Sequence, residues 1–154
     1  MKAMVVRVLL GFVVVFALLQ LVPNRVANPA TRHEPPWDSP QTRQLAVTAC
    51  FNCHSNQTHV AWFEQVAPLS WWIKSHVHDG RQALNFDEWQ PGQGGGRAAR
   101  AVQNGSMPPS YYTWVGMHSE AKLTPAQRQQ LAQGLEATLG PGGADRRGRP
   151  DRGG

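Results

Sequence analysis

One short motif, Cys50-Phe51-Asn52-Cys53-His54, restricts what this chain can fold into more than any other stretch. Two cysteines three residues apart with a histidine directly after them have the spacing for covalent haem attachment. The thiols reach the two vinyl groups while the imidazole lies under the iron. Cys50 and Cys53 are the only cysteines, so no disulfide framework competes for them. The motif predicts one covalent haem c, with His54 as the proximal ligand.

Two other interpretations of the cysteines remain open. A thioredoxin-like redox pair normally lies between a strand and a helix, and nothing strand-like precedes Cys50. A zinc site needs four ligands, which Cys50, Cys53, His54 and His59 could just supply. His59 does not lie at a usual zinc-finger spacing, and the histidine directly after the second cysteine favours haem.

The charge distribution argues against a nucleic-acid partner. The chain has 154 residues, a net charge of +5 and a pI near 9.9, which suggests one domain with appendages. Basic and acidic side chains balance over residues 37–140, so the excess charge belongs to the two ends of the chain. A basic groove in the central domain is therefore not expected.

The N-terminal residues predict membrane attachment. Residues 1–22 are almost wholly apolar and long enough for one transmembrane signal-anchor, with Arg7 able to extend its charge to the headgroups. A cleaved signal peptide would look similar, but no small-x-small cleavage site follows. Residues 23–36, rich in proline, predict an extended tether. Because covalent haem of this type is attached outside the cytoplasm, we expect an inner-membrane protein whose domain faces the periplasm.

Helix signals predict an all-α domain over residues 37–140. Ser39 and Pro40 start a helix that the cysteine motif closes, and Thr124, Pro125 and Gln127 start the last helix. The predicted helices run from Pro40 to about Cys50, from about Pro68 to Asp79 with Gly80 as the stop, over 97–103, and over 123–139. A flexible glycine loop is expected at 91–96, and a disordered basic tail at 141–154.

Met107 is the predicted distal iron ligand. Two prolines follow it directly, and they stiffen the loop and fix the thioether without a helix behind it. His76, His78 and an open site are the alternatives. The remaining residues expected to contact the cofactor are Trp72, as an aromatic wall, and Arg81, Tyr111 and Tyr112, as partners of the haem propionates; ordinary core packing would explain the aromatic residues equally well.

Four blocks of sequence resemble the bacterial haem-binding-domain proteins, small membrane-anchored monohaem relatives of cytochrome c. The blocks read CFNCHSNQT, APLSWWIKSHVHDGR, LNFDEW and GSMPPSYYTWVGMHSEAKLT, between Ser39 and about Leu135. The resemblance implies an all-α cytochrome-c-like fold, thioethers at Cys50 and Cys53, His54 as proximal ligand and Met107 as distal ligand. The chain departs from the family at His59–Phe63 and in the glycine-rich segment 92–96.

The predicted function is one-electron transfer by a haem that alternates between ferric and ferrous iron, and no enzymatic activity is expected. A methionine sulfur opposite histidine favours the ferrous form. The alternatives are a haem sensor or peroxidase-like protein with an open or labile distal site, and a non-haem zinc or dithiol interaction module. The sequence does not identify the redox partner.

Overall fold

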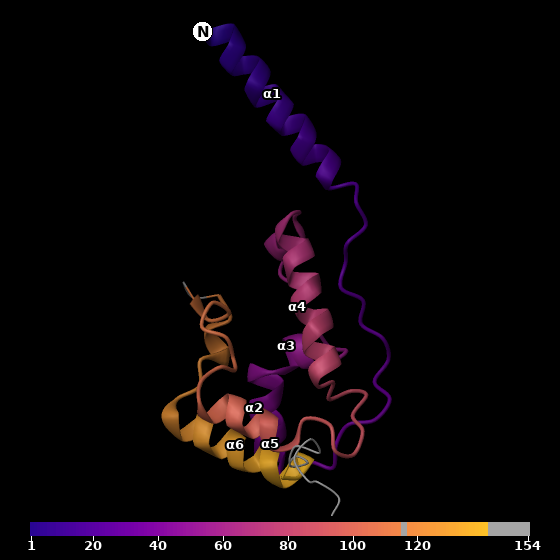
Figure 1. Ribbon diagram of the computed structural model, residues 1–154, viewed down its shortest axis with the longest axis vertical. Coiled ribbons are helices and arrows are strands. Elements are labelled where there is room, and N and C mark those ends of the chain that lie inside the picture. Colours follow the sequence, from indigo (N-terminus) through magenta and orange to yellow (C-terminus); the bar gives the residue numbers. More distant parts are fainter. Residues whose placement is uncertain (115–116, 142–154) are drawn as a thin grey trace, which may run out of the picture.

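The computed structural model describes residues 1–114 and 117–141, in which the regular secondary structure is helical and the helices are joined by extended segments and loops (Figure 1). The helices are α1 (Lys2–Leu19), α2 (Pro40–Ala49), α3 (Phe51–His54), η1 (Trp62–Gln65), α4 (Leu69–Ala83), α5 (Gly95–Gln103), η3 (Ser119–Ala121) and α6 (Pro125–Leu139), where η marks a 3-10 helix. No strand occurs in these ranges, and the His33–Glu88 pairing is an isolated bridge. The predicted all-α class is confirmed. The tail predicted at 141–154 lies outside the described residues except for Pro141.

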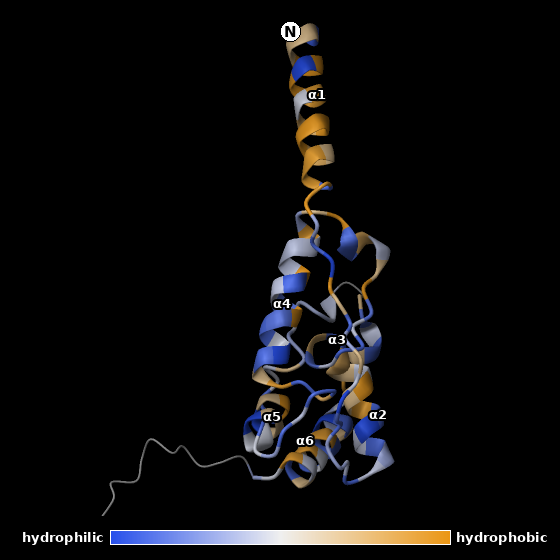
Figure 2. Ribbon diagram, turned by 90° about the vertical axis from the view of Figure 1, so that its right-hand side faces the viewer, coloured by the Kyte–Doolittle hydropathy of each residue, from blue (hydrophilic) through white to orange (hydrophobic). Residues whose placement is uncertain are grey.

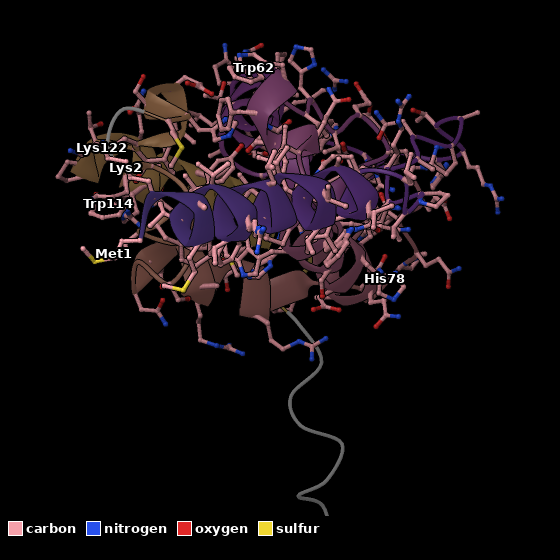
Figure 3. All side chains as sticks on the ribbon, turned by 90° about the horizontal axis from the view of Figure 1, so that it is seen from above. Met1, Lys2, Trp62, His78, Trp114 and Lys122 are labelled. Carbon is pink, nitrogen blue, oxygen red and sulfur yellow. The ribbon has the colours of Figure 1, made fainter. Side chains whose placement is uncertain are left out.

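Helix α1 stands apart from the other helices and is almost entirely hydrophobic (Figures 1 and 2). Its 18 residues span about 27 Å at 1.5 Å per residue, close to the thickness of a bilayer core. None of its residues is buried against the domain. By length and composition the helix can cross a membrane, a property that it shares with signal sequences. Figure 3 looks from above, with α1 in front of the domain and Trp62 at the edge.

Two helix starts form as their sequences predict. The Ser39 hydroxyl accepts a hydrogen bond from the Thr42 amide at 3.1 Å and caps α2, with Pro40 in the first turn. At α6 the Thr124 hydroxyl accepts from the Gln127 amide at 3.2 Å, and the Gln127 side chain accepts from the Thr124 amide at 2.9 Å. This reciprocal capping box satisfies backbone donors that a helix start otherwise leaves unpaired.

Helix α4 does not stop at Gly80 as predicted but continues to Ala83. A Cβ atom on Gly80 would lie 2.5 Å from the carbonyl oxygen of Cys53, so this glycine lets α3 and α4 approach closely. The prediction was wrong because the glycine serves a contact between two helices rather than a helix end.

The glycine-rich segment is also more ordered than predicted. Helix α5 begins at Gly95, within the expected flexible loop, and Gly94, Gly95 and Gly96 are buried. Gly94 has a φ of +81°, and a Cβ atom there would lie 3.0 Å from the Leu84 side chain. Small residues are therefore needed where α5 starts, because the neighbouring chain leaves no room for a side chain.

The hydrophobic core joins α2, α3, α5 and α6. Phe51 stacks on Phe86 with ring centroids 5.4 Å apart, and Leu131 and Leu135 of α6 are fully buried. Gly134 faces Thr42 of α2 so closely that a Cβ atom would overlap the threonine side chain. The glycine that weakens α6 locally therefore allows α2 and α6 to pack.

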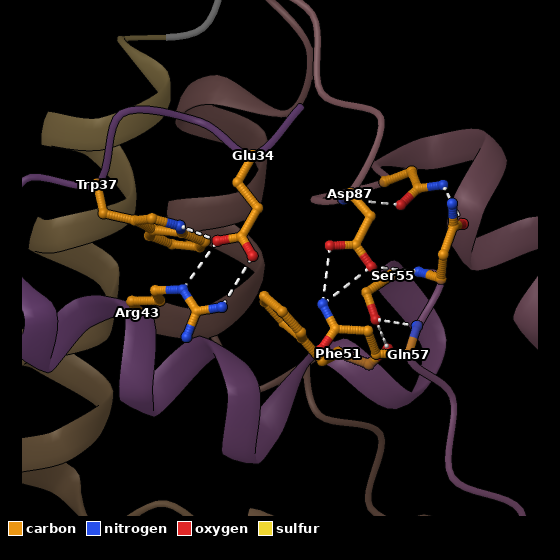
Figure 4. Close-up of polar contacts among 9 residues, drawn as sticks. Glu34, Trp37, Arg43, Phe51, Ser55, Gln57 and Asp87 are labelled. Carbon is orange, nitrogen blue, oxygen red and sulfur yellow. Dashed lines mark hydrogen bonds and ion pairs between the residues drawn. The ribbon is translucent and has the colours of Figure 1, made fainter. Parts of the chain in front are cut away.

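The proline-rich segment 23–36 is extended, as predicted, and it packs along the domain. The amides of Arg32 and His33 donate to the Asp87 carbonyl at 2.9 and 3.0 Å, and the Trp89 amide donates to the His33 carbonyl at 3.0 Å. Glu34 accepts two hydrogen bonds from Arg43, each 2.8 Å long, and one from the Trp37 indole at 2.8 Å (Figure 4). These contacts fix the end of the segment to α2.

Glu34→Gln is expected to lower the free energy of unfolding by about 1 kcal/mol at neutral pH, because it removes the charge from this bidentate pair. The Arg43 hydrogen bonds hold the pKa of Glu34 below its ordinary value of 4.5. The stabilisation is therefore present above that value and is lost as the pH falls through the lower pKa of the folded state. Urea unfolding at neutral and acid pH tests both effects.

The matched control is Glu136→Gln, which changes an exposed carboxylate of α6 that has no ion pair among the described residues. This control should change stability by only a few tenths of a kcal/mol. A Glu34→Gln effect that stays equally large at acid pH would contradict the ion-pair explanation.

Candidate functional site

The cysteine motif forms one helical turn, in which some side chains face a cavity and one faces the hydrophobic core. Cys53 and His54 donate their amides to the Cys50 carbonyl at 3.1 and 2.9 Å. Positions three and four apart share one face of a helix, so Cys50, Cys53 and His54 all line one cavity. Phe51 points instead into the core, where it is 3% exposed. The buried phenylalanine anchors the turn while the three reactive side chains face the cavity.

His54 is oriented by the segment that follows α4. Its Nδ1 lies 3.0 Å from the Leu84 carbonyl, and because a carbonyl only accepts, Nδ1 carries the proton. The Phe86 amide donates to the His54 carbonyl at 2.7 Å. Burial lowers the pKa of His54, which favours the neutral ring. A neutral imidazole whose Nδ1–H is engaged leaves Nε2 for a metal, as in most histidine-ligated sites.

The two cysteines form no disulfide, and their surroundings favour the protonated thiol. Burial raises the pKa of Cys50 to about 12, and burial also raises the pKa of Cys53. Dithiol exchange requires a thiolate, which a raised pKa disfavours. Among residues 1–114 and 117–141, no group of three or more His, Cys, Asp or Glu side chains is placed to hold a metal ion, and His59 is exposed outside the cavity. This part of the chain therefore offers no zinc ligand set.

The cavity beside the motif has a volume of about 590 Å³, within the usual range for small-molecule and cofactor sites. One wall comes from α3, α4 and the segment after α4, and the other from α5, α6 and residues 107–112. Its lining is mostly apolar and comprises Ala49, Cys50, Asn52, Cys53, His54, His76, Asp79, Gly80, Gln82, Ala83, Leu84, Phe86, Gly94, Arg97, Ala98, Ala101, Val102, Met107, Pro108, Pro109, Tyr111, Tyr112 and Leu135. A flat apolar ring with two polar substituents fits such a lining.

Met107 lies in this lining and is 37% exposed. Its amide donates to the Ala101 carbonyl at 3.0 Å. The Arg128 guanidinium donates to the carbonyls of Val102 at 2.7 Å and Met107 at 3.2 Å, which ties the loop to α6. Sequence reasoning missed Arg128. Its position in the first turn of α6 was a usable signal. A cation there interacts unfavourably with the helix dipole, which suggests that a tertiary contact compensates.

Asn52, inside the motif, is a second residue that sequence reasoning missed. Its amide nitrogen donates to the Tyr112 hydroxyl at 2.6 Å, and its amide oxygen accepts from the His59 amide at 2.9 Å. Burial raises the pKa of Tyr112, whose ring stacks on His118 at 4.2 Å. The motif thereby holds the loop that carries Tyr112 against the cavity.

The structure places the two tyrosines that were predicted as propionate partners at the cavity, but not the tryptophan that was predicted as its aromatic wall. Tyr111 and Tyr112 line the cavity, whereas Trp72 is 43% exposed and reaches it only through its neighbours. The Trp72 ring lies 4.0 Å from the His76 ring and 5.2 Å from the Tyr111 ring. Of the two histidines considered as alternative ligands, His76 lines the cavity, while His78 is exposed and contacts Gln82.

Arg81 does not line the cavity. It donates to the carbonyls of Ser55 and Ala27, both at 2.7 Å, and to the side chains of Asn28 and Thr58. These contacts hold the extended segment against the turn that follows the motif. Arg97, at the start of α5, is exposed, lines the cavity and forms no ion pair among the described residues. It is therefore the arginine that the fold brings to the site.

Comparison with known proteins supports haem binding. A family model described as a haem-binding domain matches residues 14–137, which include the cysteine motif, Met107 and every helix except the start of α1 and the end of α6. No curated protein and no solved structure matches the chain.

Gly80→Ala is expected to destabilise the protein by about 1–3 kcal/mol, because the added methyl group has to push α4 away from the Cys53 carbonyl. An ordinary interior glycine of a helix behaves oppositely, since alanine there gains about 1 kcal/mol. Urea unfolding provides the measurement. Ser75→Ala, at an exposed position of the same helix, is the control. Unchanged or increased stability of Gly80→Ala would show that α3 and α4 do not touch there.

Proposed function

This chain belongs to the haem-binding domain family, and from that premise we propose that it is a membrane-anchored c-type monohaem protein that transfers single electrons. The observation that carries the proposal is the cavity in which Cys50, Cys53, His54 and Met107 meet. When bound, the haem supplies an iron that cycles between the ferric and ferrous states. The rest of the function belongs to the protein, which attaches, orients and shields that group.

Cys50 and Cys53 attach the porphyrin in this proposal. Each thiol adds across one vinyl group: the S–H bond breaks, a C–S bond forms, and the hydrogen goes to the neighbouring vinyl carbon. The addition needs no oxidant, and both thiols are free and face the cavity. Two covalent bonds close together in the chain keep the cofactor in place in either oxidation state.

His54 and Met107 would hold the haem iron. The Leu84 carbonyl fixes the tautomer and the ring plane of His54, and Arg128 and Ala101 fix the loop of Met107. Ligands held in this way move little when the charge on the iron changes, which suits electron transfer. With a thioether and an imidazole as its two protein ligands, the bound iron would favour the ferrous state and have a raised reduction potential.

Helix α1 supports attachment to a membrane, for which we propose the inner membrane, with the domain on the periplasmic side. Covalent attachment of haem takes place outside the cytoplasm, so the proposed chemistry and the proposed orientation agree. The redox partner would approach the cavity from that side.

The decisive experiment is expression of the full chain with a cytochrome c maturation system. We expect haem that stays on the protein in denaturing gel electrophoresis, and we expect Cys50→Ala with Cys53→Ala to lose it. Colourless wild-type protein with two titratable thiols would refute the proposal.

Met107→Ala should abolish the ferric absorption signature of sulfur ligation and speed carbon monoxide binding to the reduced protein. Met117→Ala, which changes a methionine outside the cavity lining, should leave both properties unchanged. Fast carbon monoxide binding to wild-type protein would favour the alternative function, a sensor or peroxidase-like protein with an open or labile distal site.

Arg97 is proposed to pair with a haem propionate, a role that the sequence had suggested for Arg81. Arg97→Gln should lower the reduction potential, because losing a cation beside the haem favours the more positively charged ferric state. Arg81→Gln should leave the potential nearly unchanged and lower stability by about 2 kcal/mol through its lost hydrogen bonds. Spectroelectrochemistry and urea unfolding of both variants test the assignment. A lowered potential in Arg81→Gln with an unchanged potential in Arg97→Gln would instead assign the propionate contact to Arg81.

A further inference from the structure

A second cavity lies where α1 meets the domain. The end of α1 and the residues after it fold over the start of α4, and the Gln20 side chain binds the backbone of Ala67 in both directions. The Ala67 amide donates to Gln20 Oε1 at 2.9 Å, and Gln20 Nε2 donates to the Ala67 carbonyl at 3.3 Å. The cavity beside this clamp also has a volume of about 590 Å³. It is lined by Leu19, Gln20, Val22, Pro23, Asn24, Arg25, Gln65, Ala67, Ser70 and Lys74.

The lining selects for an anion. It contains two cations, Arg25 and Lys74, and no carboxylate, and neither cation forms an ion pair among the described residues. Ser70 is only 7% exposed, and its hydroxyl makes no hydrogen bond within the described part of the chain. The hydroxyl oxygen is open to the cavity, so together with the two cations it can serve a ligand that accepts hydrogen bonds.

The position of the cavity relative to the membrane favours a lipid as the ligand. Leu19 ends the apolar helix, so in a bilayer the cavity would lie at the level of the headgroups. Trp62, in the 3-10 helix that leads to Gln65, is 79% exposed and visible from the α1 side (Figure 3). Exposed tryptophan at that level is typical of a membrane interface. Leu19 and Val22 offer an apolar side to the ligand, while Arg25 and Lys74 offer a charged one.

We propose that this cavity binds the phosphate of an anionic phospholipid, with Arg25 and Lys74 as the charge partners and the Ser70 hydroxyl as a donor. A zwitterionic lipid would bring its own cation into a positively charged lining, so anionic lipid is preferred. The proposal rests on the membrane anchoring proposed above but not on the haem. A bound lipid would fix the domain at a set height and orientation on the bilayer.

Native mass spectrometry of the full, haem-loaded chain released from nanodiscs of mixed phosphatidylglycerol and phosphatidylcholine tests the proposal. We expect one retained phosphatidylglycerol per chain, and about a tenfold lower retention in the variant with Arg25→Gln and Lys74→Gln. The control variant, Arg32→Gln with Arg100→Gln, loses the same charge outside the cavity and should retain the lipid as wild type does. Ser70→Ala should give a smaller loss.

Equal losses in the two double variants, or equal retention of both lipids by wild type, would overturn the proposal. Displacement of the lipid by inorganic phosphate would also overturn it, because the site would then bind the free ion rather than a headgroup. The same spectra report the haem mass, so failure of the haem proposal appears as missing cofactor and failure of the lipid proposal as missing lipid. Unchanged haem absorption in the variants verifies that they fold.

Discussion

The attachment of His54 to the segment after α4 is the interaction on which the candidate site depends. The Leu84 carbonyl accepts a hydrogen bond from His54 Nδ1–H, and the Phe86 amide donates to the His54 carbonyl, so two residues of one short segment hold both the ring and its backbone. Phe86 is itself buried against Phe51 of the cysteine motif. His54 is therefore tied to the core, and the cavity wall and the proposed iron site form one unit.

The features that the sequence predicted well are those set by neighbouring residues. The caps at Ser39 and Thr124 depend on a spacing of three residues. The spacing of Cys50, Cys53 and His54 likewise indicated that they act together, although the separate short helix that carries them was not predicted. Gly80 was wrongly predicted as a helix stop because its contact with the backbone of Cys53 decides its role. The contact between Gly134 and the Thr42 side chain was not predicted either. Both contacts join separate helices, and a local pattern does not show which helices will meet.

The candidate site divides along the same line. Sequence patterns indicated the cysteine motif and Met107. They did not indicate Arg128, which supports the loop of Met107, or Arg97, which lines the cavity. Arg81 and Arg97 look alike in the sequence, and only the fold turns one towards the extended segment and the other towards the cavity. Long-range polar contacts of this kind leave little trace in one sequence, apart from misplaced charges such as Arg128 in the first turn of a helix.

The packing of residues 23–36 against the domain has a consequence for how the proposed carrier would meet its partners. A loose linker would let the domain sweep a hemisphere above the membrane, whereas the contacts of Gln20, Arg81 and Glu34 hold it close to the end of α1. Encounters then depend on lateral diffusion in the plane of the bilayer. Only proteins whose own redox centre lies at the same height above the membrane would exchange electrons with it. The short proline-rich segment would thereby restrict which partners can react.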